Sequence, residues 1–162
     1  MIERLRLSQT ARPLDVLHHW SKERILELSP PYQRGEVWGK IRQRNLIRSI
    51  VFGIPIPSII INDRFSAGWE NDESIAVIDG KQRITSILKL FDDRLQIPGE
   101  WFGMEGMVYY SELPLPQQRG LKQRPIPFCE GQLKTMEDEQ ELFELVNFGG
   151  VPQGESDEIE LD

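Results

Sequence analysis

The chain has very little cysteine and histidine. Cys129 is the one cysteine among its 162 residues, and His18 and His19 are the two histidines. A single cysteine excludes an internal disulfide, and one thiol with two imidazoles makes a dedicated zinc site improbable. Adjacent histidines point about 100° apart on a helix, so we expect surface or partly buried side chains rather than a metal pair. Cys129 is expected to be a small core residue, and the default compartment is reducing and cytoplasmic.

The sequence also lacks a long hydrophobic run. Its longest apolar stretch, residues 54–61, is interrupted by Pro55 and Pro57, and falls short of the roughly 20 apolar residues that a membrane helix needs. Residues 1–12 mix charges with leucines, which is not the pattern of a signal peptide. With 39% hydrophobic and 28% charged residues, the composition is ordinary for a globular domain, and we expect no association with membranes.

Positive charge is in the minority, with a formal net charge of −7, but it is unevenly distributed. Residues 1–53 contain ten Lys and Arg against five Asp and Glu, a balance of +5 that leaves −12 for the remainder. The total charge therefore does not exclude a nucleic-acid partner. Residues 155–162 alone hold five carboxylates. We expect one folded domain over residues 1–152 and an acidic, disordered tail over residues 153–162.

The spacing of apolar residues predicts short strands and helices in one α+β domain. Helices are expected over residues 14–21, 38–52, 82–92 and 115–122, and after Thr135, with an apolar face of Leu142, Leu145 and Val146. Strands are expected over residues 25–28, 58–62, 75–78 and 107–110. Residues 126–128 are expected to form a short edge strand, because Pro127 cannot donate to a central ladder.

The most informative segment is a polar corner, residues 79–83 (Asp-Gly-Lys-Gln-Arg), between the expected strand 75–78 and the following helix. A strand that turns sharply into a helix leaves unpaired N–H groups and partial positive charge, which attract phosphate. Gly80 permits a positive φ, Lys81 and Arg83 supply cationic donors, and Asp79 is suited to a divalent ion or a hydroxyl. The alternative is a helix with a solvated charged first turn, because Asp-Gly turns are common.

A second candidate surface is basic. Lys40, Arg44 and Arg48 recur every four residues on the expected helix 38–52, with Arg42 nearby. These four side chains either form a solvated outer face or contact the phosphate backbone of DNA.

Separated motifs together resemble a known family. They are Tyr32-Gln33-Arg34 followed by Trp38, then Gly53, Pro55 and Pro57, then residues 79–83, and finally Phe143 and Asn147 with Gly149-Gly150. The combination, over about residues 14–152, resembles the N-terminal domain family of GmrSD-type modification-dependent restriction enzymes, which is related to the N-terminal domain of SspE. That family is a branch of the ParB/sulfiredoxin-like fold, so the resemblance implies a small mixed sheet with flanking helices.

The resemblance implies NTP binding, and in several members NTP hydrolysis, in modification-dependent restriction or phage defence. Because Asp79 is suited to a divalent ion, we expect Mg²⁺ to accompany the NTP. Transferred to this sequence, the catalytic residues are Asp79, Gln82 and Arg83, with Asp79 also as metal ligand. The nucleotide-binding residues are Gln33, Arg34, Gly80, Lys81, Thr85 and Asn147.

One departure and three absences qualify this transfer. Lys81 stands where the family usually has glutamine, so an amide that would position water is lost and binding is expected more firmly than hydrolysis. The sequence has no Walker-type loop and no nucleophilic cysteine at the corner. It also has no His-Asn-His arrangement, so nuclease activity is expected from a separate subunit. The alternatives are a non-catalytic DNA-binding adaptor of ParB-like type and a partner-binding or inhibitor module whose acidic end imitates DNA.

Overall fold

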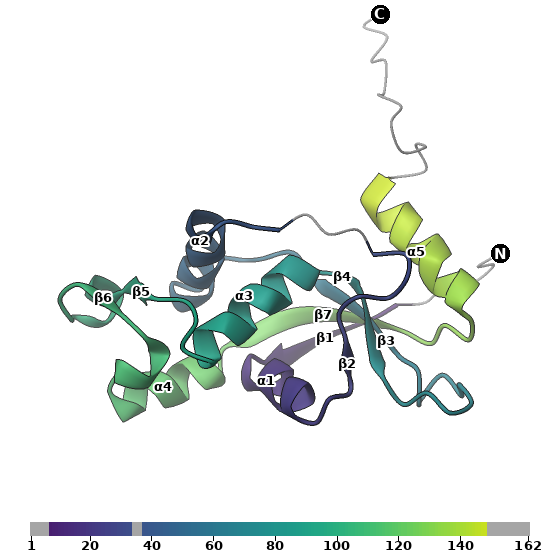
Figure 1. The fold of residues 1–162 in the computed structure, drawn as a ribbon, viewed down its shortest axis with the longest axis horizontal. Coiled ribbons are helices and arrows are strands. Elements are labelled where there is room, and N and C mark those ends of the chain that lie inside the picture. The colour runs from purple at the N-terminus through teal and green to yellow at the C-terminus, as the bar shows by residue number, and fades with distance from the viewer. Residues whose placement is uncertain (1–6, 34–36, 149–162) are drawn as a thin grey trace, which may run out of the picture.

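A five-stranded mixed sheet lies at the centre of the molecule (Figure 1). The computed structural model describes residues 7–33 and 37–148, so the acidic segment 153–162 lies outside the described residues. Strand order across the sheet is β1 (Ser8–Pro13), β7 (Pro125–Gly131), β3 (Ile59–Asp63), β4 (Ile75–Asp79) and β2 (Leu26–Glu27). The pairs β1–β7 and β3–β4 are antiparallel, whereas β3–β7 and β2–β4 are parallel. The predicted α+β class with a small mixed sheet is confirmed.

Helices cover both faces of this sheet. The described helices are α1 (Asp15–Lys22), α2 (Lys40–Val51), α3 (Lys81–Phe91), α4 (Leu115–Lys122) and α5 (Met136–Phe148), with 3₁₀ turns η1 (Gly99–Phe102) and η2 (Tyr110–Glu112). A two-stranded ribbon of β5 (Ile97–Pro98) and β6 (Met107–Val108) precedes α4.

Alternate strand residues enter two separate cores, as the period of a strand requires. Ile59, Ile61 and Val77 belong to the larger core, which α1, α2 and α3 cover. Ile60 and Ile78 point the other way, into a smaller core that α5 closes with Leu142 and Phe143. The sheet is therefore sandwiched between three helices and α5, and strands β3 and β4 are buried on both faces.

Two expectations about the C-terminal third are wrong, and a third holds only in part. Residues 126–128 do not form an edge strand, because β7 extends over seven residues between β1 and β3. The edge is formed by β1, whose polar and mostly exposed residues give no alternating apolar signal. The apolar face of α5 is also different, since Leu142 and Phe143 are buried while Leu145 and Val146 are 51% and 39% exposed. The strand expected over residues 107–110 is limited to β6 and gives way to η2.

The histidines and the cysteine occupy the structural environments that the sequence predicts. The His18 ring stacks on Phe91 at a centroid distance of 5.2 Å, and its Nε2 lies 3.3 Å from Asp92 Oδ1. His19 is exposed, and Cys129 is buried in the smaller core. None of the helices in residues 7–33 and 37–148 has the length and apolar character that crossing a bilayer requires.

Tyr110 anchors η2 to the larger core. Its hydroxyl donates to the Gln118 carbonyl at 3.2 Å. Burial raises the pKa of Tyr110 to about 12, and the nearby carboxylates of Asp15 and Asp93 act in the same direction.

Candidate functional site

The corner between β4 and α3 turns at Gly80. This residue has a φ of 109°, in the left-handed region, and α3 begins at the next residue. A Cβ at this position would lie 3.1 Å from Ile59 Cγ1 and 3.2 Å from Arg83 Nη2, so a side chain would be strained by the backbone conformation and tightly packed against these two neighbours. No side chain caps the start of α3. The first-turn N–H groups therefore lack a side-chain acceptor, and the predicted strand-turn-helix geometry is present.

Arg83 and Asp79 form an ion pair across this turn. Arg83 Nη2 donates to Asp79 Oδ2 at 3.1 Å and to the Ser58 carbonyl at 3.2 Å. The side chains of Arg83 and Asp79 are 12% and 31% exposed. Arg83 Nε is buried and has no hydrogen-bond partner among the described residues. A guanidinium has five N–H donors, so Arg83 retains the capacity to bind an anion.

Residues 28–33 and 37–39, which lie between β2 and α2, contribute contacts to the corner. Lys81 Nζ donates to Ser29 Oγ at 3.0 Å, and Gln82 Oε1 accepts from Trp38 N–H at 3.2 Å. Gln33 Nε2 donates to the carbonyls of Val77 and Ile78 at 2.8 and 3.0 Å. The structure thus brings Gln33 beside the strand that ends at Asp79. Arg34, the other expected wall residue, lies outside the described residues.

Two further expected residues make no hydrogen bond to the corner within the described part of the chain. Thr85 lies in the second turn of α3 and is half-buried. Asn147 lies near the end of α5, where its Nδ2 donates to the Phe143 carbonyl of the same helix at 2.8 Å. Gly149 and Gly150, which complete that motif, lie outside the described residues.

Asp79 is the carboxylate that the corner offers to a metal. Its Oδ2 accepts from Arg83, and its Oδ1 accepts no hydrogen bond from the described residues. The described residues contain no group of three or more His, Cys, Asp or Glu side chains placed to hold a metal ion. Magnesium commonly takes one or two carboxylates and completes its coordination with substrate phosphates and water, and Asp79 fits that mode.

The four expected DNA-binding residues do not share one face of α2. Arg44 and Arg48 line a groove beside η1, and Arg44 Nε donates to the Gln96 carbonyl at 2.9 Å. The Arg42 guanidinium instead lies over the Trp38 ring, 4.8 Å from its centroid. A turn of about 100° per residue places Arg42 on the opposite flank from Arg44, and Lys40 on the Arg44 side.

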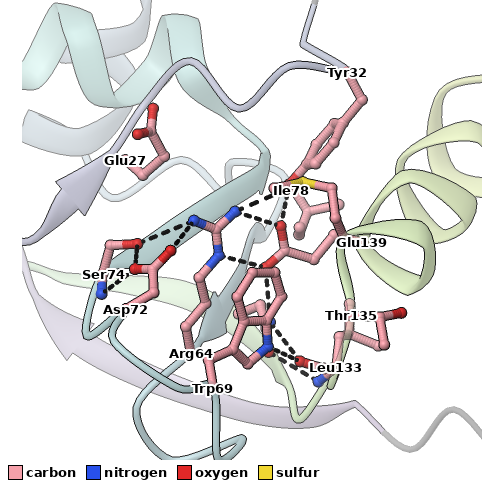
Figure 2. Close-up of polar contacts among 12 residues, drawn as sticks. Glu27, Tyr32, Arg64, Trp69, Asp72, Ser74, Ile78, Leu133, Thr135 and Glu139 are labelled. Carbon is pink, nitrogen blue, oxygen red and sulfur yellow. Dashed lines mark hydrogen bonds and ion pairs between the residues drawn. The ribbon is translucent and has the colours of Figure 1, made fainter.

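A buried ionic network, which the sequence did not reveal, attaches α5 to the sheet (Figure 2). Arg64 follows β3 and is 4% exposed, and Glu139 in the first turn of α5 is fully buried. Arg64 Nε and Nη2 donate to the two Glu139 oxygens at 2.9 and 2.7 Å. On its other side Arg64 Nη1 donates to Asp72 Oδ2 at 2.8 Å. This bidentate geometry is the strong form of a charge-assisted pair.

The remaining lone pairs of Glu139 are also used. Asn62 Nδ2 donates to Oε1 at 2.8 Å, and the Tyr32 hydroxyl donates to Oε2 at 3.1 Å. Burial, followed by the Glu139 charge, raises the pKa of Tyr32 far above its usual value, so the phenol stays protonated. The hydrogen bond to Glu139 raises the pKa of Arg64 and outweighs the effect of burial. The network is therefore a fixed ion pair with satisfied hydrogen bonds.

Opposing influences act on the pKa of the Asp72 carboxyl group. Burial acts to raise the pKa of Asp72, but hydrogen bonds from Ser74 and the charge of Arg64 together lower it below its ordinary value. Its side chain is one-third exposed, so solvent screens part of the interaction with Arg64.

The network reaches the candidate site through Tyr32. The Tyr32 ring packs against Phe143 of α5 at 5.4 Å, while the adjacent Gln33 binds the β4 carbonyls. The segment that covers the corner is thus held by both α5 and β4. The sequence places Arg64 in a polar loop and Glu139 in an acidic first turn, both typical of solvated residues. A weak clue is that Arg64 follows directly on the buried run of β3.

The family of the chain follows from one comparison with known proteins. A family model described as the GmrSD restriction endonuclease, N-terminal domain, matches residues 17–127. Neither the curated proteins nor the solved structures gave a match. The matched range is more than half of the chain and contains the corner, the segment that covers it and α2. The chain therefore belongs to the GmrSD restriction endonuclease N-terminal domain family.

Proposed function

We propose that the corner between β4 and α3 binds a nucleoside triphosphate with Mg²⁺, and that the domain couples this binding to a DNA transaction in restriction. The observation that carries the proposal is the partly used Arg83 guanidinium beside the uncapped start of α3. Arg83 Nη1 makes no hydrogen bond to the described residues and is not one of the covered nitrogens, so it is the nitrogen from which a phosphate oxygen would accept, whereas Nε is covered by the protein. Helix N-termini also favour anions.

The side chains around the corner suit a triphosphate. Lys81 and Arg83 provide positive charge, and Gly80 lets an anion approach the backbone closely. Mg²⁺ would be held by Asp79 and the phosphates, and would supply neutralisation of phosphate charge. Gln82 uses its Oε1 to hold Trp38, which leaves its Nε2 as a donor toward the ligand. Phosphoryl transfer depends mainly on positioning and electrostatics, so these residues suffice chemically.

The proposal distinguishes binding from turnover. Lys81 replaces the amide that the family usually carries, so binding has the stronger support, and hydrolysis would rely on Gln82 to orient water. Isothermal titration with each of the common NTPs in Mg²⁺ tests the first part, and a phosphate-release assay tests the second.

Replacement of Arg83 is the decisive variant. Hydrogen bonds to charged groups contribute about 1.5–3 kcal/mol, so Arg83→Ala is expected to weaken NTP binding by roughly 10- to 150-fold. Arg94→Ala removes an exposed arginine just after α3 and is the matched control. Thermal melts are needed, because Arg83 also holds Asp79 and the Ser58 carbonyl. Unchanged NTP affinity in a folded Arg83→Ala protein defeats the assignment.

DNA contact is the second part of the proposal, and α2 supports it. Lys40, Arg44 and Arg48 lie on one side of this helix, whereas Arg42 lies on the other. Two or three phosphate contacts predict a log-log salt dependence with a slope of about −2 to −3 for duplex DNA. A slope near zero would remove duplex binding by this surface.

A further inference from the structure

A groove of about 600 Å³ lies between α2 and η1. Its walls include the cations Arg44 and Arg48, the aromatic rings of Phe52 and Trp101, and the carboxylate of Glu100. The volume is within the range of about 300–1,000 Å³ that is usual for ligand sites. The combination of two arginines with two aromatic rings indicates a ligand that has both negative charge and flat apolar surface.

The two arginines are arranged along the helix. They are four residues apart, so their backbones are separated by about 6 Å along the axis of α2. Arg44 is held by one bond from Nε to the Gln96 carbonyl, which fixes the guanidinium and leaves its other nitrogens available. Arg48 is exposed and makes no ion pair within the described residues. These properties suit successive phosphates of one strand.

Of the two aromatic rings, that of Phe52 is open to solvent, whereas Trp101 is half-buried and packs against the larger core. Phe52 is 55% exposed, and its ring meets that of Trp101 edge to face at a centroid distance of 6.2 Å. Basic grooves with exposed aromatic rings bind single-stranded nucleic acids, because each base can stack on a ring irrespective of sequence. A paired base in a duplex has no open face to offer and must first be unstacked at a cost of a few kcal/mol.

A second cavity, of about 260 Å³, adjoins the groove at the same Phe52 and Trp101. It is lined by the apolar side chains of Val51, Phe102 and Leu121 together with Gln117 and Arg124. Gln117 Oε1 is buried and has no hydrogen-bond partner among the described residues. The edge of a base carries both donors and acceptors, and so matches Gln117 and Arg124. An apolar peptide side chain would leave Gln117 Oε1 unpaired.

We propose that this groove binds an unpaired nucleic-acid strand. Its phosphates contact Arg44 and Arg48, and one base stacks at Phe52 and Trp101 with its edge toward the smaller cavity. The inference rests on the DNA-binding part of the proposed function and specifies its substrate as an unpaired rather than a duplex segment.

Fluorescence anisotropy with two labelled probes tests the proposal. The probes are an oligothymidylate of about 12 nucleotides, within the usual site sizes, and a hairpin duplex of similar length. The single strand is expected to bind more tightly, and Trp101→Ala is expected to weaken it by roughly 5- to 150-fold. Arg48→Ala is expected to reduce the salt slope for the single strand by about 0.7. Lys22→Ala removes a cation from α1 and is the matched control, with no change expected.

Further variants and ligands separate the outcomes. Phe52→Ala removes a largely exposed ring and keeps the test valid if Trp101→Ala fails to fold. Duplex binding equal to or tighter than single-strand binding overturns the inference, as does unchanged affinity in the folded aromatic variants. A glutamate-rich peptide with one tryptophan that binds more tightly than either probe would overturn it in favour of an acidic protein partner.

The proposed function is measured independently on the same proteins. Duplex binding that needs Arg44 but not Trp101 would leave the DNA part of the proposed function standing while the groove inference falls. If the wild type binds the single strand but no NTP, the corner assignment fails while the groove inference stands.

Discussion

Glu139 accepts four hydrogen bonds, from the buried Arg64 and Asn62 and the half-buried Tyr32, and its replacement by glutamine tests whether the ionic network holds α5 in place. Glutamine keeps the shape of the side chain but removes the negative charge. Arg64, at 4% exposed, then retains Asp72 as its remaining charged partner. Breaking a buried pair by removing one partner costs about 3–5 kcal/mol. Because Asp72 still compensates part of the charge, we expect the lower end, about 3 kcal/mol.

This loss is large compared with the stability of a domain. Total free energies of unfolding are about 5–15 kcal/mol, and for a chain of this length each kcal/mol shifts the melting temperature by about 2–4 °C. Glu139→Gln is therefore expected to lower the urea midpoint strongly with an unchanged slope. Glu137→Gln, in the same first turn but exposed, is the matched control and should cost under about 1 kcal/mol.

The comparison of the two variants decides the question. If the free energies of unfolding of Glu139→Gln and Glu137→Gln differ by less than about 1 kcal/mol, the Arg64–Glu139 ion pair does not hold α5 in place, and the reasoning from burial is refuted. Replacing both Arg64 and Glu139 by methionine is expected to be less harmful than Glu139→Gln alone, because no fully buried charge is then left unpaired. Asp72 also loses Arg64, but it is one-third exposed and keeps its hydrogen bonds from Ser74.

Gly80→Ala is expected to cost roughly 1–3 kcal/mol in urea unfolding, because a φ of 109° strains alanine and its Cβ meets Ile59; an unchanged midpoint would contradict this backbone geometry. In Asp72→Asn, the free energy of unfolding is expected to fall less steeply with decreasing pH than it does in the wild type. The pKa of Asp72 is lowered in the fold, so its contribution is present above the ordinary pKa and is lost as the pH falls. Melts of both proteins in acid check this, and parallel curves would exclude it. Tyr110 has its pKa raised from 10.0 to about 12, so its contribution is present below pH 10.0 and is lost as the pH rises through about 12. Between pH 10.0 and about 12 the wild type should lose stability more steeply than Tyr110→Phe. Equal slopes of stability against pH in the two proteins would contradict this role of Tyr110.

The local elements around the corner were predictable because their signals are local. The apolar runs at residues 59–61 and 75–78, the glycine at 80 and the helical spacing of Ile84, Ile87 and Leu88 specify strand, turn and helix without reference to the rest of the chain. The fold class followed from the same patterns. These signals also placed the conformational constraint at Gly80 correctly.

Long-range polar pairs were not predictable in this way. Arg64 and Glu139 are 75 residues apart, and each lies in a sequence context that is typical of solvated charge. Their burial depends on which face of the sheet α5 covers, and no local periodicity encodes that choice. The helical turn of 100° per residue already separates Arg42 from Arg44, but the contact of Arg44 with the Gln96 carbonyl, 52 residues away, was hidden for a similar reason.

The pairing of β1 with β7 and the contact of α5 with Arg64 extend the packed structure beyond the stretch that matches the family. The matched range, 17–127, omits β1, ends inside β7 and lacks α5. A recombinant fragment trimmed to those limits would expose the backbone of a truncated inner strand, a template for intermolecular aggregation. It would also leave the Arg64 guanidinium without the acceptors that Glu139 supplies. Expression boundaries for relatives of this protein are therefore better chosen from strand pairing than from the extent of sequence similarity.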